Sequence, residues 1–568
     1  MNASVIALLL IAVLIVAAFA LMIIRAKRAD ENNFEKSIAD SWGKINPRLF
    51  LVQDLEKIRE FSEAEQDASP EGSSDSIDAI TAKDIDLDLV FSQIAGSVMS
   101  SPGAEVLYAW LRHPLLRESL LKHRIELQEC LASDEEGRKK MQRALYEIGF
   151  LKGSSFFHDL KELQSAGLIG TGKFIFLSAA TAAALILLFI RPLIAVIVLI
   201  PLIAFNFHIH MSMKKSSKEP LRGIDALISL INGAGELSAL MTKEAFSEEK
   251  AEMEECLQVL SPFKRGAFLV TSKGSVGDGL FDAVMEYVKL LFHIDLIRYD
   301  RMIGAAKAHE AEIRRLFYVI GTIDASCASA SYMEALPVSC RPEFTDRKVL
   351  EVREMGHPLL SDPVRNSIAA DRPVLLTGSN ASGKSTFLKN TALCAILAQS
   401  AGCVPAASYT APFFRVFSSM ALTDHLMQGE SYFIVEIRSL KRIFDAASEE
   451  GPPVLGFVDE VLRGTNTIER IAASAQVLKT LGTKNALLFA ATHDIELSQL
   501  LEDSFTNMHF EESMEDGDLR FDYKLREGRA VSGNAIALLK KEGFPDEMTS
   551  ASGKMAETYE KEGIWKLL

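Results

Sequence analysis

Three segments of the chain are apolar almost without interruption. Residues 3–24 form the first, and residues 174–190 and 193–207 form a pair that is split by Arg191 and Pro192. A helix needs about 20 apolar residues to cross roughly 30 Å of hydrocarbon, and the first run has that length. Each run of the pair spans only roughly 22–26 Å at 1.5 Å per residue. The pattern predicts an N-terminal membrane anchor and a helical hairpin of two short spans.

Positive charges beside these runs predict their orientation. Basic residues follow the first run and do not precede it, which favours an uncleaved anchor with its N-terminus outside. A cleaved signal peptide is the alternative. Lysines flank the hairpin at both of its ends, whereas its outer turn carries only Arg191. The positive-inside rule then predicts a multi-pass protein of the cytoplasmic (inner) membrane with the rest of the chain in the cytoplasm. A buried pair of core helices is the alternative for residues 174–207.

Other segments have the spacing of helices or of short buried strands. Residues 220–335 predict long helices, because apolar positions recur near every 3.6 residues, as in 281–292. Residues 62–82 are rich in Ser, Glu and Asp and predict a linker. Three short apolar runs, at 373–377, 454–458 and 486–491, are typical of strands buried on both faces. The predicted fold is therefore an α/β domain joined to an all-α domain, with transmembrane helices.

A candidate binding motif follows the first predicted strand. The segment fits G-x-x-x-x-G-K-[ST], the phosphate-binding P-loop, and a helix is predicted directly after it. The glycines let backbone N–H groups approach the phosphates of ATP, while a lysine reaches the β- and γ-phosphates and a hydroxyl holds Mg²⁺. The predicted ATP-binding residues are Gly378, Ser379, Asn380, Ala381, Ser382, Gly383, Lys384, Ser385 and Thr386.

The other two predicted strands also end in residues suited to catalysis. The second ends in Asp459 and Glu460, an arrangement in which Asp459 binds Mg²⁺ together with Ser385 and Glu460 activates the attacking water. The third is followed by His493, placed to sense the γ-phosphate. The sequence therefore predicts Glu460, His493 and Lys384 as catalytic groups, and ATP and Mg²⁺ as cofactors. A structural histidine is the alternative for His493.

These residues also carry a family resemblance. The matching segments lie at 356–358, 377–386, 402–406, 424–433, 459–467 and 491–493, and in order and spacing they resemble the ATPase domain of the MutS family of DNA mismatch-repair proteins. The resemblance covers about residues 350–547 and extends more weakly to 91–115 and 313–326, which look like parts of the MutS helical core. It departs from mismatch-repair members at residues 379–382 and 468–470, which indicates a divergent branch.

The resemblance implies a homodimer with composite ATP sites. Ser431 would contact the γ-phosphate bound to the partner subunit, Asn380 would contact phosphate, and residues 463–465 would line the dimer seam. A helix N-cap is the structural alternative for Ser431. The resemblance also implies DNA binding and a repair or recombination role. Residues 25–83 are too short for a mismatch-reading domain, so mismatch specificity is not expected, and DNA binding itself stays open.

Composition and charge limit the kinds of partner and site that we expect. The net charge is −15 and the pI is about 5.4, whereas a duplex-binding surface usually has a basic face. The candidate basic runs are short, at 138–143 and at Arg314 and Arg315. Mean hydropathy is +0.13, raised by the apolar runs. The six cysteines have no C-x-x-C spacing, which is typical of reduced thiols rather than zinc or disulfide sites.

The predicted domains follow from these features. They are an anchor (1–28), a juxtamembrane segment with an acidic linker (29–83), a first helical part (84–173), the hairpin (174–207), a second helical part (208–340) and the ATPase domain (341–568). The favoured function is an ATP-driven switch held at the membrane. The alternatives are an ABC-type ATPase coupled to transport and an ATP-switched membrane scaffold without a DNA role. Few polar residues lie in the hairpin (Ser178, Thr181, Asn206 and His208), which disfavours transport.

Overall fold

The computed structural model describes residues 22, 25, 28–29, 31–36, 38, 41–68, 76–151, 153, 155–168, 170–216, 218–265, 267–270, 279–379, 382–420, 432–462, 466–515, 518–530, 536, 539–540 and 542–562. The predicted anchor at 3–24 lies almost wholly outside these residues. The chain forms two compact units. Unit 1 comprises Met1–Ala68, Ser92–Ala109 and His123–Ala335, and unit 2 comprises Ser69–Phe91, Trp110–Lys122 and Leu336–Leu568.

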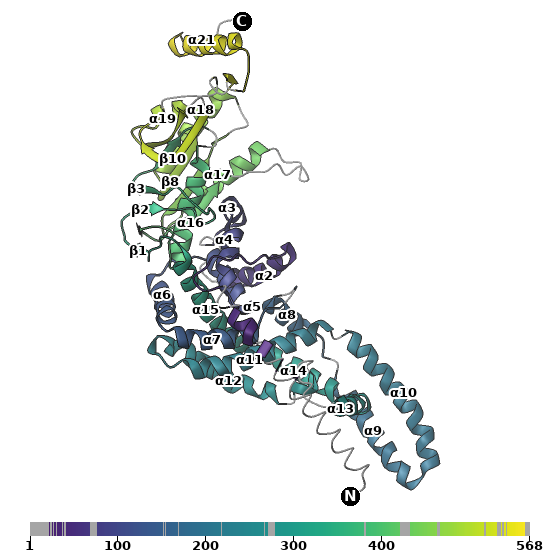
Figure 1. Ribbon diagram of the computed structural model, residues 1–568. Helices are drawn as coiled ribbons and strands as arrows, with labels where there is room; N and C mark the ends of the chain where they lie inside the picture. Colours follow the sequence, from purple (N-terminus) through teal and green to yellow (C-terminus); the bar gives the residue numbers. More distant parts are fainter. Residues whose placement is uncertain are drawn as a thin grey trace. The chain divides into compact units, whose positions relative to one another are not determined.

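Unit 1 is helical where it is described, as the 3.6-residue spacing predicted (Figure 1). Its boundaries with unit 2 fall inside α4, α5 and α6 and at the C-terminal ends of α2 and α15. Its long central helix α15 is buried along most of its length. The α-helices with residues in this unit are α2 (Val52–Ala68), α4 (Leu87–Ile94), α5 (Ser101–Arg112), α6 (Glu118–Ser133), α7 (Glu135–Ile148), α8 (Phe156–Ser165), α9 (Thr171–Ile190), α10 (Pro192–Ser216), α11 (Lys218–Leu240), α12 (Ser247–Leu260), α13 (Gly279–Phe292), α14 (Ile294–Ala308) and α15 (Glu310–Ala335).

Two buried carboxyl groups join helices of unit 1. Asp324 of α15 accepts hydrogen bonds from the backbone N–H of Met99 (3.0 Å) and of Ser100 (2.8 Å), at the start of α5. Glu105 of α5 accepts from the N–H groups of Phe156 (2.6 Å) and Phe157 (3.0 Å), at the start of α8. The N-terminal N–H groups of a helix have no partner within the helix, so each carboxyl group satisfies donors that burial would otherwise leave unpaired.

Glu105 makes the stability of unit 1 depend on pH. Burial raises its pKa from 4.5 to about 8, against the opposing effect of the two N–H donors. The unfolded chain therefore loses this proton first, and stability falls as pH rises from about 4.5 to about 8, by at most about 1.4 kcal/mol per pH unit. We expect Glu105→Gln to flatten this fall. Melting temperatures in detergent between pH 5 and 8 measure it, with exposed Glu126→Gln as control. An unchanged pH slope in Glu105→Gln would contradict the assignment.

The predicted hairpin is present, but its helices are longer than the apolar runs. Helices α9 and α10 extend beyond the runs at their inner ends, where residues 171–173 and 208–213 include polar side chains and are still helical. The candidate spans, Thr171–Ile190 and Pro192–Met213, have 20 and 22 residues, and each is long and apolar enough to cross a membrane. At 1.5 Å per residue they extend roughly 30–33 Å, so the predicted shortfall in length was wrong.

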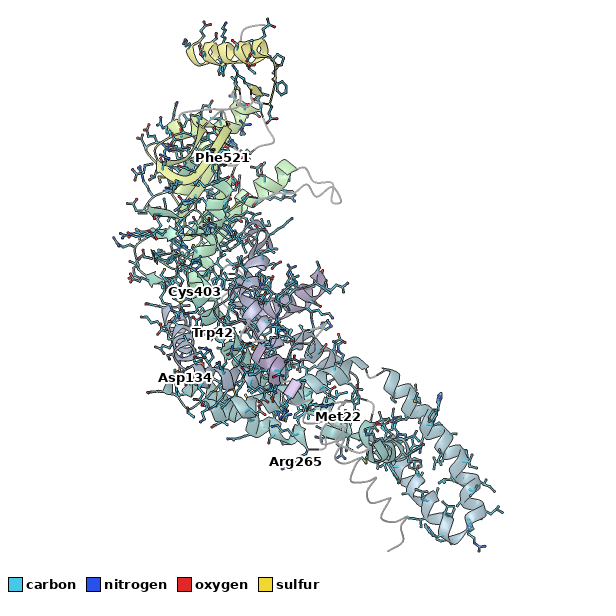
Figure 2. All side chains as sticks on the ribbon, viewed as in Figure 1. Met22, Trp42, Asp134, Arg265, Cys403 and Phe521 are labelled. Atoms are coloured by element: carbon cyan, nitrogen blue, oxygen red, sulfur yellow. The ribbon has the colours of Figure 1, made fainter. Side chains whose placement is uncertain are left out.

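Most described side chains of the hairpin are not buried. Only 22% and 11% of the two span windows are buried, and Phe189 and Leu193 near the turn are 91% and 77% exposed. Sticks project outward along both helices in Figure 2. The exposed apolar surface disfavours the alternative of a buried core pair.

Polar groups near the base of the hairpin bind the neighbouring helix instead of lining a channel. The Ser178 hydroxyl donates to the Phe292 carbonyl (2.5 Å), and the Asn206 amide donates to Thr181 Oγ1 (3.0 Å) and to the Leu291 carbonyl (3.3 Å). Leu291 and Phe292 end α13, whose last carbonyls lack partners within the helix. These contacts attach α13 to the hairpin.

Unit 2 is built on a six-stranded sheet in the order β10-β9-β4-β8-β7-β6. All strands are parallel except β10, which is antiparallel to β9. The three strands predicted from apolar runs are β4, β7 and β8, and they lie side by side. The sheet comprises β4 (Val374–Thr377), β6 (Arg415–Ser419), β7 (Val454–Asp459), β8 (Ala486–Thr492), β9 (Thr506–Glu515) and β10 (Asp518–Glu527).

Helices and a second sheet complete unit 2 (Figure 1). The second sheet has the order β1-β5-β2-β3, with β1 (Glu343–Phe344), β2 (Leu350–Met355), β3 (Asn366–Ala370) and β5 (Ser408–Ala411). The α-helices lying wholly in this unit are α3 (Ala79–Asp84), α16 (Lys384–Ser400), α17 (Tyr432–Ser448), α18 (Thr467–Gly482), α19 (Ile495–Leu500) and α21 (Asp546–Glu562). The carboxyl ends of the parallel strands meet at one edge of the main sheet, where ligands bind in open α/β folds.

Two predicted domain boundaries need correction. Residues 29–83 are not all linker, because they contain α2 and α3, and only 69–75 between these helices lies outside the described residues. The helical core predicted from residue 84 is also interrupted, because residues 84–91 and 110–122 belong to unit 2 with the ATPase domain. Charge and polarity suggested a linker here, but Thr81 and Asp84 of α3 make long-range polar contacts with the chain near β6, which a local pattern does not reveal.

Candidate functional site

The P-loop connects β4 to α16 as predicted. Gly378 has φ +143° and Gly383 has φ +108°, conformations that side-chain-bearing residues rarely adopt. A Cβ on Gly378 would lie 3.0 Å from both the Phe510 carbonyl oxygen and Ser382 Oγ, so a side chain there would also be tightly packed. Gly383 precedes the first residue of α16, whose N-terminus points at the loop and favours anions. Asn380 and Ala381 lie outside the described residues.

Donors converge on this loop. The Lys384 ammonium group donates to the carbonyls of Gly378 and Ser379, at 2.7 Å each. Ser382 is buried, and its hydroxyl oxygen has no hydrogen-bond partner among the described residues. The Ser379 hydroxyl donates to Glu512 of β9. A phosphate group in the loop would give Lys384 and Ser382 an anionic partner, which is the arrangement expected of a phosphate-binding site.

Ser385 and Asp459 meet as the sequence predicted. The Ser385 hydroxyl oxygen lies 2.5 Å from Asp459 Oδ2, although the residues belong to α16 and to the end of β7. The two residues bring a hydroxyl and a carboxylate oxygen to one place, and these are ligand types suited to Mg²⁺, which prefers oxygen and usually takes few ligands from protein. Thr386, next to Ser385, is exposed and lines the neighbouring cavity.

Glu460 and His493 are in direct contact at the ends of two neighbouring strands. The contact joins Glu460 Oε1 to His493 Nε2. The Glu460 backbone has φ +56°, and its N–H donates to the Ala491 carbonyl (2.9 Å) at the end of β8. Glu460 is 12% exposed and His493 34% exposed, so both are within reach of a ligand. A positive φ at a glutamate is strained, and such strain gathers at functional sites.

A cavity of about 260 Å³ lies beside the P-loop. Burial lowers the pKa of His357 to about 4, with a smaller effect of Lys389 in the same direction, so the imidazole is neutral at pH 7. A neutral ring among aromatic side chains suits a planar heteroaromatic base. The lining residues are His357, Leu360, Asp362, Pro363, Val364, Asn366, Gly383, Thr386, Phe387, Asn390, Phe510 and Tyr523.

Sequence reasoning missed most of this cavity. His357 had a place only in a family motif, and Phe510 and Tyr523 come from β9 and β10, more than a hundred residues after the P-loop. Their strands pair next to β4, and no local motif marks them. Glu512 was missed for the same reason. Ser431 and residues 463–465, which the resemblance placed at a dimer seam, lie outside the described residues.

The two basic runs considered for DNA contact are largely neutralised within unit 1. Arg315 contacts Glu252 and Glu255, at 2.9 Å each, and Arg314 contacts Glu65. Arg138 is buried, with its guanidinium 3.5 Å from the centre of the Trp42 ring. The remaining cations of the 138–143 run form ion pairs with nearby glutamates, namely Lys139 with Glu135, Lys140 with Glu136, and Arg143 with Glu147. Neither run presents a concentrated positive field.

The fold and the loop together define a P-loop nucleotide-binding domain. Comparison with known families identifies it further, since residues 374–560 match the profile of MutS domain V. Through these residues, about a third of the chain, the protein is similar to the MutS family.

Curated relatives agree with this placement. The chain is 36% identical over 203 residues to "DNA mismatch repair protein MutS 2" of Haloarcula marismortui, covering 34% of the chain and 21% of the relative. It is 31% identical to "DNA mismatch repair protein MutS" of Lactobacillus delbrueckii subsp. bulgaricus over 278 residues and of Lactobacillus acidophilus over 284 residues, each covering 47% of the chain. The chain spans 32% and 33% of those two relatives.

Proposed function

We propose that this protein is a membrane-anchored MutS-like ATPase that binds and hydrolyses ATP to switch its helical unit. The meeting of Ser385 with Asp459, beside the pair of Glu460 and His493, carries the proposal. It gathers a hydroxyl, two carboxylates and an imidazole at one sheet edge, within the reach of a nucleotide in the P-loop.

The residues have separate roles in this mechanism. Backbone N–H groups of the P-loop and Lys384 hold the phosphates. Ser385 and Asp459 would hold Mg²⁺, which neutralises charge on the β- and γ-phosphates. Glu460 orients the attacking water and accepts its proton. His493 holds the Glu460 carboxylate in position through Nε2 and would sense the γ-phosphate. The cavity beside His357 receives the base.

Lys384→Ala should weaken ATP binding. The substitution removes the charged donor from the phosphates, and hydrogen bonds to charged groups contribute about 1.5–3 kcal/mol, which corresponds to roughly 10- to 150-fold in affinity. Titration with a fluorescent ATP analogue measures the change. Lys479→Ala, an exposed lysine on α18, is the matched control. Equal affinities of wild type and Lys384→Ala would refute the assignment of the phosphate site.

Dimerisation through ATP is the second part of the proposal. It rests on the family resemblance of the segment around Ser431, which would complete the site of the partner subunit. Light scattering of the purified protein with and without ATP is the measurement. An oligomeric state that does not respond to ATP, in protein that binds ATP, would refute the composite site.

Membrane anchoring is the third part. Its support is the exposed apolar surface of α9 and α10, together with lysines at the inner ends of the hairpin. Both ends of the hairpin belong to unit 1, which requires an even number of crossings between them. The ATPase domain would then lie in the cytoplasm.

DNA binding is tested by the ATPase rate of the solubilised protein with and without duplex, branched and mismatched DNA over a salt series. Stimulation that falls steeply with salt would support a DNA-dependent switch, because phosphate contacts release counterions. An intact ATPase that ignores every DNA would instead support a membrane or protein target, the scaffold alternative. A substrate-dependent ATPase rise in liposomes would favour the transport alternative.

A further inference from the structure

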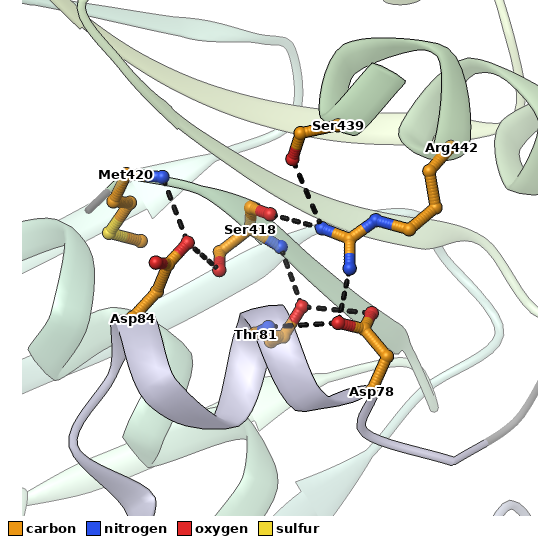
Figure 3. A network of polar contacts seen from close by, with 7 residues as sticks. All are labelled: Asp78, Thr81, Asp84, Ser418, Met420, Ser439 and Arg442. Atoms are coloured by element: carbon orange, nitrogen blue, oxygen red, sulfur yellow. Dashed lines mark hydrogen bonds and ion pairs between the residues drawn. The ribbon is translucent and has the colours of Figure 1, made fainter. Parts of the chain in front are cut away.

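The outer strand of the main sheet, β6, is covered by a helix from a distant part of the sequence. The N–H of Ser418 donates to Thr81 Oγ1 (3.0 Å), and the N–H of Met420 donates to Asp84 Oδ2 (2.9 Å). Asp84 also accepts from the Ser418 hydroxyl at 2.7 Å. Helix α3 thus supplies the acceptors that a neighbouring strand would supply, and Figure 3 shows its side chains reaching β6.

The same helix also holds α17. Asp78, which caps the N-terminus of α3 by accepting from the Thr81 N–H (2.9 Å), forms an ion pair with Arg442 of α17. The Arg442 guanidinium donates as well to the Ser418 carbonyl on β6. Arg442 therefore connects α3, β6 and α17 at one point (Figure 3).

The other end of α17 holds the catalytic loop. Glu436 is 3% exposed and accepts a hydrogen bond from the Leu462 N–H. Leu462 follows Glu460 by two residues, and both have positive φ, +60° and +56°. Such a backbone persists only where its surroundings hold it. Glu436 and Arg442 lie less than two turns apart on α17, so the helix transmits displacement between them as a rigid rod.

We propose that α3 positions the Glu460 loop through α17, with Asp78, Arg442 and Glu436 as positioning residues for ATP hydrolysis. The inference rests on the proposed ATPase function and describes how the rate of hydrolysis is regulated. The chain runs from α3 through α4 directly into the helical unit, so the segment that ties the catalytic loop is continuous with the segment that the ATP switch is expected to move. Turnover then responds to the position of α3 without any change in the ATP pocket.

The test uses the full-length protein in detergent and two readouts. Asp78→Asn keeps an N-cap acceptor but loses the ion pair, and Arg442→Gln removes its partner. We expect each to lower kcat roughly 2- to 30-fold, with ATP affinity within about twofold of wild type, because coupling of this kind is modest. The double variant should be no slower than the slower single, since both remove one contact. Lys441→Gln, which loses only an exposed pair with Asp445 on the same helix, should match wild type.

The second readout does not need activity. Amide hydrogen exchange of the peptide containing residues 459–462 should speed up in Asp78→Asn and Arg442→Gln and stay unchanged in Lys441→Gln. Wild-type exchange in both variants would overturn the inference, as would equal losses of kcat and ATP affinity. A wild-type protein without ATPase activity would refute the proposed function alone, while faster exchange of this loop would still support the tie between α3 and the loop.

Discussion

Glu460→Gln is expected to lower the rate of ATP hydrolysis about 10²- to 10⁴-fold while ATP stays bound. The amide has nearly the size of the carboxyl group but cannot accept the proton of the attacking water. The amide also lacks the negative charge that faces His493. Lys384, Ser385 and Asp459 are untouched, so the phosphates and Mg²⁺ keep their partners. A variant that binds ATP but does not turn it over should also accumulate the ATP-bound dimer.

Phosphate release and nucleotide binding, measured on the same preparation, separate the two effects. Glu469→Gln is the matched control, because this glutamate is exposed in the first turn of α18, which follows the catalytic loop. A normal hydrolysis rate in Glu460→Gln would exclude Glu460 as the base. A joint loss of binding and turnover would show that Glu460 supports the fold of the site rather than the reaction.

The second large effect is expected from labelling the turn of the hairpin. A cysteine at Arg191 should react in intact cells with a membrane-impermeant maleimide, whereas one at Lys479, on the ATPase domain, should react only after the membrane is opened. The reason is that two spans of roughly 30 Å place the turn on the side opposite both units. The difference should be close to all or none.

Labelling of the natural cysteines should be low in this experiment. Four of the six natural cysteines are buried, and only Cys130 and Cys340 are partly exposed, so replacing these two with serine removes most unwanted labelling. Labelling of both positions in intact cells, or of neither, would contradict the proposed topology. Labelling in intact cells of the cysteine at Lys479 alone would show that the orientation is opposite to the predicted one.

The parts of the site that could be predicted from sequence are those that neighbours in the chain build. The P-loop needs a strand, two glycines and a helix in succession, and β4, Gly378, Gly383 and α16 occur in that order. Ser385 and Asp459 could be paired across the sheet, because parallel strands end at a common edge.

The parts that could not be predicted depend on distant segments with no motif of their own. The cavity beside the P-loop needs β9 and β10 to pair next to β4 before Phe510 and Tyr523 approach His357. Helix α3 has only six residues, and its position on β6 depends on three polar side chains whose partners come much later in the chain. The hairpin helices extend beyond their apolar runs because a residue need not be apolar to be part of a helix.

The bond between Thr81 and Ser418 also has a consequence for how the protein is made. The two residues are 337 positions apart, so α3 leaves the ribosome long before the strand that it covers. At a synthesis rate of about 5–20 residues per second, β6 is made on the order of tens of seconds after α3. During that interval the helical segments and the hairpin leave the ribosome. Helix α3 therefore cannot dock on the ATPase sheet until about three quarters of the chain has been translated, and a nascent chain that ends before β6 lacks the strand that α3 covers.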